Sequence, residues 1–352
     1  MKIVIDARQI ISRPTGGETV LYNVFRYIFT KDKENKYVFF LNKKLNSNNR
    51  IFSLKQANVR FRRIPLDGGA FSKTILQQLV IPFYLFMEKP DVYFYPLHDL
   101  PFLHPYKKIV VVYDLKRIFL PVKDLSSWFV KIYTKIITKL AIKIAYKVIC
   151  ISNNTKTNLE AIGAKNVQVI YLGVDDGFKM QKNKKHYKER FVLFVGENRP
   201  HKNVQVVINA FKSLDNQDYK LFIVGPGFEA KEDGNIKFCG VVSDEELVSL
   251  YNSAEVLVFP SLYEGFGLPI IEAMACGCPV IASNCSVLPE TCGGAALLIE
   301  PTEENIAKAI KGVIKDKKLR NELRQRGLKR AKEFRWEKTA EAWFKILVGD
   351  EK

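Results

Sequence analysis

Short hydrophobic runs alternate along the chain with stretches in which hydrophobic positions recur every three to four residues. The runs predict buried strands, and the stretches predict helices that cover them. This alternation is typical of parallel sheets with helices on both faces, so the pattern predicts an α/β fold with two Rossmann-like halves. The predicted strands are 2–6, 37–41, 91–95, 108–113, 147–151 and 167–171 in the first half, and 191–195, 219–224, 236–239, 255–259 and 279–283 in the second.

A lysine-rich stretch with little hydrophobic periodicity separates the two sets of strands. Such a stretch indicates a linker. The pattern therefore predicts an N-terminal domain over residues 1–175, a linker over 176–190 and a C-terminal domain over 191–335. Residues 336–352 carry large hydrophobic side chains at helical spacing and predict a terminal helix.

Composition indicates a globular protein, because 47% of the 352 residues are hydrophobic. No run approaches the 18 apolar residues of a membrane-spanning helix, and the N-terminus lacks the hydrophobic core of a signal peptide. We therefore expect a cytoplasmic protein with reduced thiols. Cys276 and Cys278 form a C-x-C pair without a nearby histidine or second cysteine pair, so no zinc site is expected.

Positive charge is concentrated in the first half of the chain. Residues 1–190 hold 34 Lys and Arg against 14 Asp and Glu, whereas residues 191–352 hold 21 against 23. This asymmetry predicts an anionic partner for the N-terminal domain. A nucleic-acid-binding protein would also explain the charge and would show basic residues interleaved with stacking aromatics, but the closely spaced pair Glu264 and Glu272 has no place in such a protein, so a nucleic acid is not expected.

A predicted helix over residues 126–147 carries much of this charge. Two interpretations are open: a solvated basic face above a hydrophobic face that packs on the core, or a docking surface for an anionic membrane, peripheral on the inner face of the plasma membrane. The basic stripe consists of Lys131, Lys135, Lys139, Lys143 and Lys147, and the hydrophobic face of Ile132, Ile136, Ile137, Leu140 and Ile144.

Residues 261–283 are the most informative stretch for chemistry. Glu264 and Glu272 stand eight positions apart, and a glycine-rich turn between them opens a helix-like run. A strand followed by a glycine turn and a helix directs backbone N–H groups and the helix N-terminus at a phosphate. An ordinary crossover between strands has no need of a glutamate directly before Gly265-Phe266-Gly267.

This stretch, with Pro269, resembles the Glu-x7-Glu signature of retaining family 4 glycosyltransferases. The resemblance covers nearly the whole chain, most securely residues 190–345. It implies the GT-B fold, in which two Rossmann-like domains face a central cleft and a terminal helix crosses back to the N-terminal domain. It also implies that a sugar is transferred from a nucleotide-sugar with retention of configuration, by front-face attack on the side of the leaving phosphate. No metal or other cofactor is implied, and no Asp-x-Asp triplet occurs.

The resemblance implies roles for individual residues of the donor site. Glu264 would contact hydroxyls of the transferred sugar, and Glu272 would accept hydrogen bonds from the ribose. Arg199 and Lys202, which follow predicted strand 191–195, resemble the basic pair that clamps the donor diphosphate and stabilises its developing charge. Backbone groups expected near the nucleotide and its phosphates are those of Gly16, Gly17, Gly196, Gly265, Phe266, Gly267 and Leu268.

The N-terminal domain departs from the family pattern at one position. Family members often carry His-Asp-Leu after the strand at 108–113, whereas this chain has Tyr113-Asp114-Leu115. Asp114 keeps its place as a candidate catalytic residue. His98, after another predicted strand, is a second candidate that could reach the same cleft, although a lone histidine near a strand end is more often structural. A catalytically silent family member is one interpretation of Tyr113.

The segment Asn198-Arg199-Pro200-His201-Lys202-Asn203 resembles members that use GDP-mannose. We therefore expect mannosyl transfer to a lipid-linked or polysaccharide oligosaccharide, with a UDP-sugar donor as the alternative. An epimerase of this fold would need more acid/base groups around the sugar than a chain with four histidines offers. A dehydrogenase would need a glycine fingerprint at the first strand–helix turn, which is absent.

Overall fold

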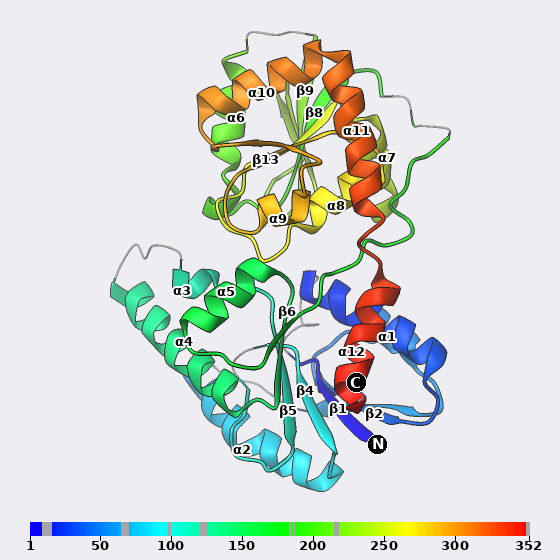
Figure 1. The fold of residues 1–352 in the computed structure, drawn as a ribbon, viewed down its shortest axis with the longest axis vertical. Helices are drawn as coiled ribbons and strands as arrows, with labels where there is room; N and C mark the ends of the chain where they lie inside the picture. The colour runs from blue at the N-terminus through cyan, green and yellow to red at the C-terminus, as the bar shows by residue number, and fades with distance from the viewer. Residues whose placement is uncertain are drawn as a thin grey trace. The chain divides into compact units, whose positions relative to one another are not determined.

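The computed structural model describes residues 1–8, 16–64, 70–97, 100–119, 125–182, 185, 187–214 and 218–349. The chain divides into two compact units (Figure 1). Unit 1 comprises Met1–Leu172 and Trp336–Lys352, and unit 2 comprises Gly173–Arg335. Each unit is built around a seven-stranded sheet.

The sheet of unit 1 is parallel and has the order β3-β2-β1-β4-β5-β6-β7. Its central strands read as continuous hydrophobic runs because helices cover both faces of the sheet. The strands are β1 (Lys2–Asp6), β2 (Lys36–Asn42), β3 (Val59–Ile64), β4 (Val92–Tyr95), β5 (Lys107–Val112), β6 (Lys147–Cys150) and β7 (Val167–Val169).

The helices of unit 1 include the C-terminal helix, which packs on α1. The Trp343 ring of this helix is fully buried and lies 5.2 Å from the Phe94 ring of β4. The helices are α1 (Gly16–Lys31), α2 (Ala70–Glu88), α3 (Lys116–Phe119), α4 (Leu125–Ile144), α5 (Asn153–Ala161) and α12 (Trp336–Val348), with a 3-10 turn η1 (Arg50–Leu54).

The sheet of unit 2 has the order β10-β11-β9-β8-β12-β13-β14. Its strands are parallel except β10, which pairs antiparallel with β11 at one edge. The strands are β8 (Arg190–Val195), β9 (Tyr219–Val224), β10 (Lys231–Asp233), β11 (Ile236–Gly240), β12 (Val256–Phe259), β13 (Val280–Ser283) and β14 (Leu297–Ile299).

Two hydrophobic clusters in unit 2 share the sheet's residues by alternation along each strand. In β8, for example, Leu193 belongs to one cluster and Phe194 to the other. The helices are α6 (Val204–Lys212), α7 (Asp244–Ser253), α8 (Leu268–Ala275), α9 (Leu288–Cys292), α10 (Glu303–Lys315) and α11 (Lys317–Ala331), with a 3-10 turn η2 (Pro200–Lys202).

All of the strands predicted from the pattern are present, with ends within two residues, and β3, β10 and β14 are additional. Residues 176–190, predicted as a linker, lie in unit 2, where Phe178 and Tyr187 pack against its core. Among the described residues, no helix combines the length and hydrophobicity needed to cross a bilayer.

The structure contradicts one of the two interpretations of the helix at 126–147, the one in which its hydrophobic face packs on the core. Ile132, Ile136, Leu140 and Ile144 are 37–52% exposed, although this interpretation placed them on the core. The buried face is instead formed by Thr134, Thr138, Ala141 and Ile142, which also recur at helical spacing. Of the predicted lysine stripe, Lys135, Lys139 and Lys143 are exposed and Lys131 is half-buried, whereas Lys147 belongs to β6 and not to the helix.

Candidate active site

The strand order of unit 2 places two of the predicted motifs side by side. From β8 the chain proceeds to β9 on one side of the sheet, and from β12 it proceeds to β13 on the other. β8 and β12 are neighbours, so the point at which the strand order reverses lies between them. Ligands of open α/β sheets bind outside the carboxyl ends of the strands at such a point. The loops that leave β8 and β12 there carry Lys202 and Glu264.

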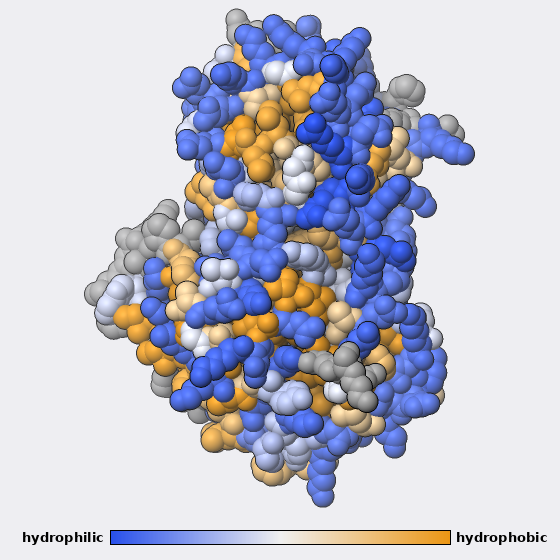
Figure 2. Space-filling view, viewed as in Figure 1, coloured by the Kyte–Doolittle hydropathy of each residue, from blue (hydrophilic) through white to orange (hydrophobic). Residues whose placement is uncertain are grey.

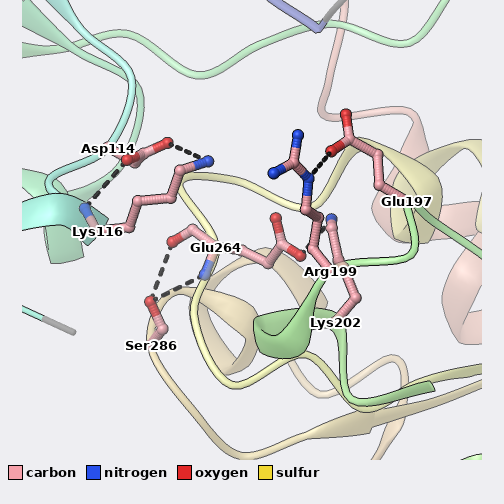
Figure 3. Close-up of polar contacts among 7 residues, drawn as sticks. All are labelled: Asp114, Lys116, Glu197, Arg199, Lys202, Glu264 and Ser286. Carbon is pink, nitrogen blue, oxygen red and sulfur yellow. Dashed lines mark hydrogen bonds and ion pairs between the residues drawn. The ribbon is translucent and has the colours of Figure 1, made fainter. Parts of the chain in front are cut away.

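Lys202 and Glu264 form an ion pair at this edge of the sheet. The Lys202 Nζ atom lies 2.6 Å from Glu264 Oε1, and the side chains are only 14% and 13% exposed. Figure 3 shows the two side chains pointing toward one another. The ammonium also lies 5.2 Å from the centre of the Phe259 ring, at the end of β12. Lys202 is thus held by a carboxylate and an aromatic ring, which fix its position before any ligand arrives.

The main chain at Glu264 is held by Ser286, which follows β13. The Ser286 hydroxyl donates to the Glu264 carbonyl at 3.0 Å and accepts from the Glu264 N–H at 3.4 Å (Figure 3). Ser286 itself adopts φ +54°, an uncommon value for a non-glycine residue. Ser286 was not predicted from the sequence. Its place shortly after a predicted strand, on the same edge of the sheet, was the signal that could have identified it.

Arg199, the other member of the predicted basic pair, has a different environment. Its side chain is 64% exposed, and its Nε atom lies 3.4 Å from Glu197 Oε2 (Figure 3). An exposed pair of this kind contributes about 0–1 kcal/mol. Arg199 can therefore leave Glu197 for an anionic ligand at little cost, whereas Lys202 is already positioned.

Close backbone contacts tie the loop after β8 to the loop after β9. The Gly196 N–H donates to the Val224 carbonyl at 2.9 Å, and the Asn198 N–H donates to the Pro226 carbonyl at 3.0 Å. A Cβ atom on Gly225 would lie 2.0 Å from the Gly196 carbonyl oxygen, and Gly225 has φ +142°. Only glycine fits such an approach.

The turn before α8 has the predicted layout of a strand, a glycine turn and a helix. Gly267 precedes α8 in the left-handed region, at φ +93°, and Pro269 occupies the first turn. Phe266 is buried against Phe334, and the Thr291 hydroxyl donates to the Phe266 carbonyl. The first N–H groups of a helix have no partner within it and attract an anion. The Phe266 side chain therefore anchors the turn, and the backbone N–H donors of the turn lie at the N-terminus of α8.

Glu272 lies in α8, about one turn beyond this N-terminus. Its Oε2 atom accepts a hydrogen bond from the Tyr251 hydroxyl of α7 at 3.3 Å. Burial, with a smaller contribution from Asp244 and Asp175, raises the pKa of the Glu272 carboxyl to about 7, although the Tyr251 bond acts in the opposite direction. No cation of the described residues pairs with this carboxylate, which can therefore accept hydrogen bonds from a ligand. Sequence reasoning did not find Tyr251, whose position in α7 carries no local motif.

The contacts of the candidate residues in unit 1 are less specific than those of Lys202 and Glu264. Gly16 and Gly17 form the first turn of α1 and not a loop before it. Asp114 Oδ1 accepts from the Lys116 N–H at 3.0 Å, and its Oδ2 lies 3.7 Å from Lys116 Nζ. The Tyr113 hydroxyl is buried without a hydrogen-bond partner in the described part of the chain, and burial raises the pKa of this phenol. His98 lies outside the described residues.

The chemistry of this arrangement is that of anion binding. A positioned lysine, an exposed arginine and a helix N-terminus lie at one edge of the sheet, and a half-buried glutamate lies a turn further on. Within the described ranges, no three His, Cys, Asp or Glu side chains are grouped as a metal site would require. The six cysteines are free thiols.

Comparisons with known proteins cover the two halves of the chain unequally. Residues 175–330 match the family model described as "Glycosyl transferases group 1". The chain is 38% identical over 162 residues to O-antigen chain mannosyltransferase B of Escherichia coli, with 42% of each chain covered. It is 30% identical over 220 residues to O-antigen chain mannosyltransferase RfbU of Salmonella typhimurium, with 59% of this chain and 60% of that protein covered. The chain therefore spans between two fifths and three fifths of the length of these relatives.

Solved structures resemble the chain over its whole length. Sucrose-phosphate synthase from Thermosynechococcus elongatus superimposes with a TM-score of 0.81 at 18% identity, covering 99% of this chain and 98% of that one. HepE from Anabaena, in complex with UDP and glucose, superimposes with a TM-score of 0.77 at 16% identity, with 99% of each chain covered. At this identity the likeness shows the fold, and it confirms the GT-B class predicted from the sequence.

Proposed function

We propose that this chain, whose residues 175–330 match the family model of Glycosyl transferases group 1 and whose fold is that of the GT-B class, transfers a hexose from a nucleotide-sugar with retention of configuration. The observation that carries the proposal is the mostly buried Lys202–Glu264 ion pair, which lies at the point where the strand order of the unit 2 sheet reverses. It sets a cation for the donor phosphates beside a carboxylate for the sugar hydroxyls. Glu272 would accept hydrogen bonds from the ribose of the nucleotide.

The proposed reaction proceeds on one face of the donor sugar. The acceptor oxygen forms a bond to the anomeric carbon as the bond from that carbon to the phosphate oxygen breaks, and the acceptor proton passes to the departing phosphate. Negative charge grows on the diphosphate during this step. Lys202 and Arg199, with the N–H groups of the turn before α8, would stabilise this charge. No metal ion is required in this scheme, because the side chains supply the counter-charge.

The proposed donor is GDP-mannose, and the proposed acceptor is a lipid-linked or polysaccharide oligosaccharide. Support comes from the relatives, since several are named as O-antigen or serotype-specific mannosyltransferases. The segment from Asn198 to Asn203, which carries Arg199 and Lys202, also resembles users of GDP-mannose. In this proposal Asp114 acts in unit 1 on the acceptor side.

A UDP-sugar donor is the second candidate. The HepE structure holds UDP and glucose, and its fold is that of this chain. The two candidates differ in the base and the sugar but share the diphosphate, so the pair of Lys202 and Glu264 would serve both.

The test compares GDP-mannose with UDP-glucose in the presence of EDTA and a lipid extract that contains lipid-linked oligosaccharides. Release of GDP or UDP is followed over time, and the anomeric configuration of the product is read by proton NMR. The proposal predicts GDP release with EDTA present and an α-linked product. Release only after a divalent ion is added, or a β-linked product, would contradict it. The Lys202→Ala variant shows how much of the release comes from this site.

A further inference from the structure

The outer face of α4 carries a hydrophobic stripe that the fold of unit 1 leaves in solvent. Ile132, Ile136, Leu140 and Ile144 recur every fourth residue and are 37–52% exposed. A helix that only needs to be solvated would place polar residues there. Exposed lysines adjoin the stripe at Lys135, Lys139 and Lys143. The face is therefore hydrophobic along its centre and cationic beside it.

A second helix of unit 1 exposes a similar stripe. In α2, Leu79, Phe83, Phe86 and Met87 are 54–63% exposed, whereas Ile81 and Leu85 are buried in the core. The exposed four share one side of the helix, because they are separated by four, three and one positions. The stripe consists of large side chains, two of which are aromatic.

The two stripes belong to the same side of unit 1. The crossovers from β3 to β4 and from β5 to β6 run in the same direction across the sheet, and such crossovers are right-handed, so α2 and α4 cover one face. Side chains of both helices join one core cluster. Near their ends the Phe86 ring lies 6.2 Å from the Tyr106 ring, and the ammonium of the adjacent Lys107 lies 5.2 Å from the Tyr146 ring. In Figure 2, hydrophobic and hydrophilic residues lie beside one another over α4.

We propose that this face of α2 and α4 docks unit 1 on a membrane surface that contains anionic lipid. The exposed aliphatic and aromatic side chains would enter the boundary between headgroups and acyl chains, and the lysines would meet the lipid phosphates. Such interfacial helices carry cations beside a hydrophobic stripe. The net charge over residues 1–190 has the sign that an anionic surface attracts. The exposed rings of Trp128, Tyr133 and Tyr146 are of the kind that settle at headgroup level.

The test is flotation of the purified chain with vesicles of phosphatidylcholine and phosphatidylglycerol, compared with vesicles of phosphatidylcholine alone. The chain should float with the mixed vesicles, and added salt should weaken the binding. Replacing Lys135, Lys139 and Lys143 together by Gln should lower the partition coefficient on the order of 100-fold, since each lysine contributes by roughly a factor of ten or less at such a surface. Replacing Ile132, Ile136 and Leu140 together by Ser should also lower the partition coefficient, even at low salt.

A matched control carries the same change of charge on unit 2. Lys311, Lys315 and Lys318 are exposed on α10 and α11, and their replacement by Gln should leave flotation unchanged. Equal loss in the control and in the α4 variant would overturn the proposal, as would binding to soluble heparin without binding to either vesicle. Circular dichroism melts of all variants separate lost docking from lost folding. Because the flotation experiment contains no donor sugar, its outcome does not depend on the proposed sugar transfer.

Discussion

Lys202 and Glu264, 62 positions apart in the chain, meet as an ion pair of 2.6 Å with both side chains mostly buried. The strand order brings them together, because β8 and β12 are neighbours although β9, β10 and β11 come between them in sequence. The pair therefore holds a cation and a carboxylate at one point of the sheet edge in the unliganded protein.

Replacing Lys202 by Ala should lower turnover about 100- to 1000-fold, because a preorganised charge at the leaving diphosphate is lost. Donor binding should weaken less than turnover, since the charge on the diphosphate grows in the transition state. Steady-state kinetics with saturating donor measure both effects. Lys212→Ala is the control, because that side chain is exposed and lies 3.7 Å from exposed Asp233, in an ion pair of little energetic weight. Near-native turnover of Lys202→Ala would refute the proposed clamp.

Replacing Glu272 by Gln should stabilise the free protein at pH above 7. Burial raises the pKa of this carboxyl from 4.5 to about 7. The folded state then holds a proton that the unfolded state has lost, so this group lowers stability as pH rises between these values. The Gln variant should gain about 1–3 kcal/mol above pH 7 and nothing below pH 4.5. Urea unfolding at several pH values measures the gain. Exposed Glu304→Gln should show none.

Nucleotide binding should tighten as pH rises through about 7, because ribose hydroxyls donate to the charged form of Glu272. Between pH 6 and pH 8 the affinity should rise about tenfold, with release of part of a proton near pH 7. Calorimetry in buffers of different ionisation enthalpy measures the released proton. The phosphates of the nucleotide also titrate in this range, so the relevant quantity is the difference from Glu272→Gln. An identical pH profile in the two proteins would mean that Glu272 does not contact the ribose.

Replacing Gly225 by Ala should destabilise the protein by about 3 kcal/mol or more, because the added Cβ atom would lie 2.0 Å from the Gly196 carbonyl oxygen at a φ of +142°. The loop that carries Arg199 and Lys202 would be displaced, so donor affinity should fall as well. Thermal unfolding with and without nucleotide measures both. Gly312→Ala is the matched control: it lies within α10 with nothing within 4 Å of the added atom, and it should stabilise by about 0.5–1 kcal/mol.

The strands could be predicted, and the candidate site motifs located, because each depends on local pattern. The strand β12 and the run from Glu264 to Glu272 lie in one short segment of the sequence. Gly196, Arg199 and Lys202 lie in another. The contacts of Ser286 and Tyr251 could not be predicted in the same way. Each reaches the site from another element, across 22 and 21 positions, and depends on how the helices and loops pack.

The errors have equally specific causes. In α4, Ile132, Ile136, Leu140 and Ile144 form the more hydrophobic stripe, which one of the two interpretations placed on the core, whereas the buried face contains Thr134 and Thr138. Periodicity fixes which residues share a face but not which face is buried. The strand β3 was missed because three of its six residues are arginines. It lies at the edge of its sheet, where charged side chains are common.

The most direct test of the central claim is thermal-shift binding of GDP, UDP and ADP to the purified chain, with and without EDTA, alongside Lys202→Ala and Glu272→Ala. The account predicts that GDP raises the midpoint of unfolding most, that EDTA does not reduce the shift, and that both variants diminish it. A larger shift with UDP would transfer the assignment to a UDP-sugar donor at the same site. No shift with any nucleotide, or a shift that both variants retain in full, would contradict the claim that this site binds the donor.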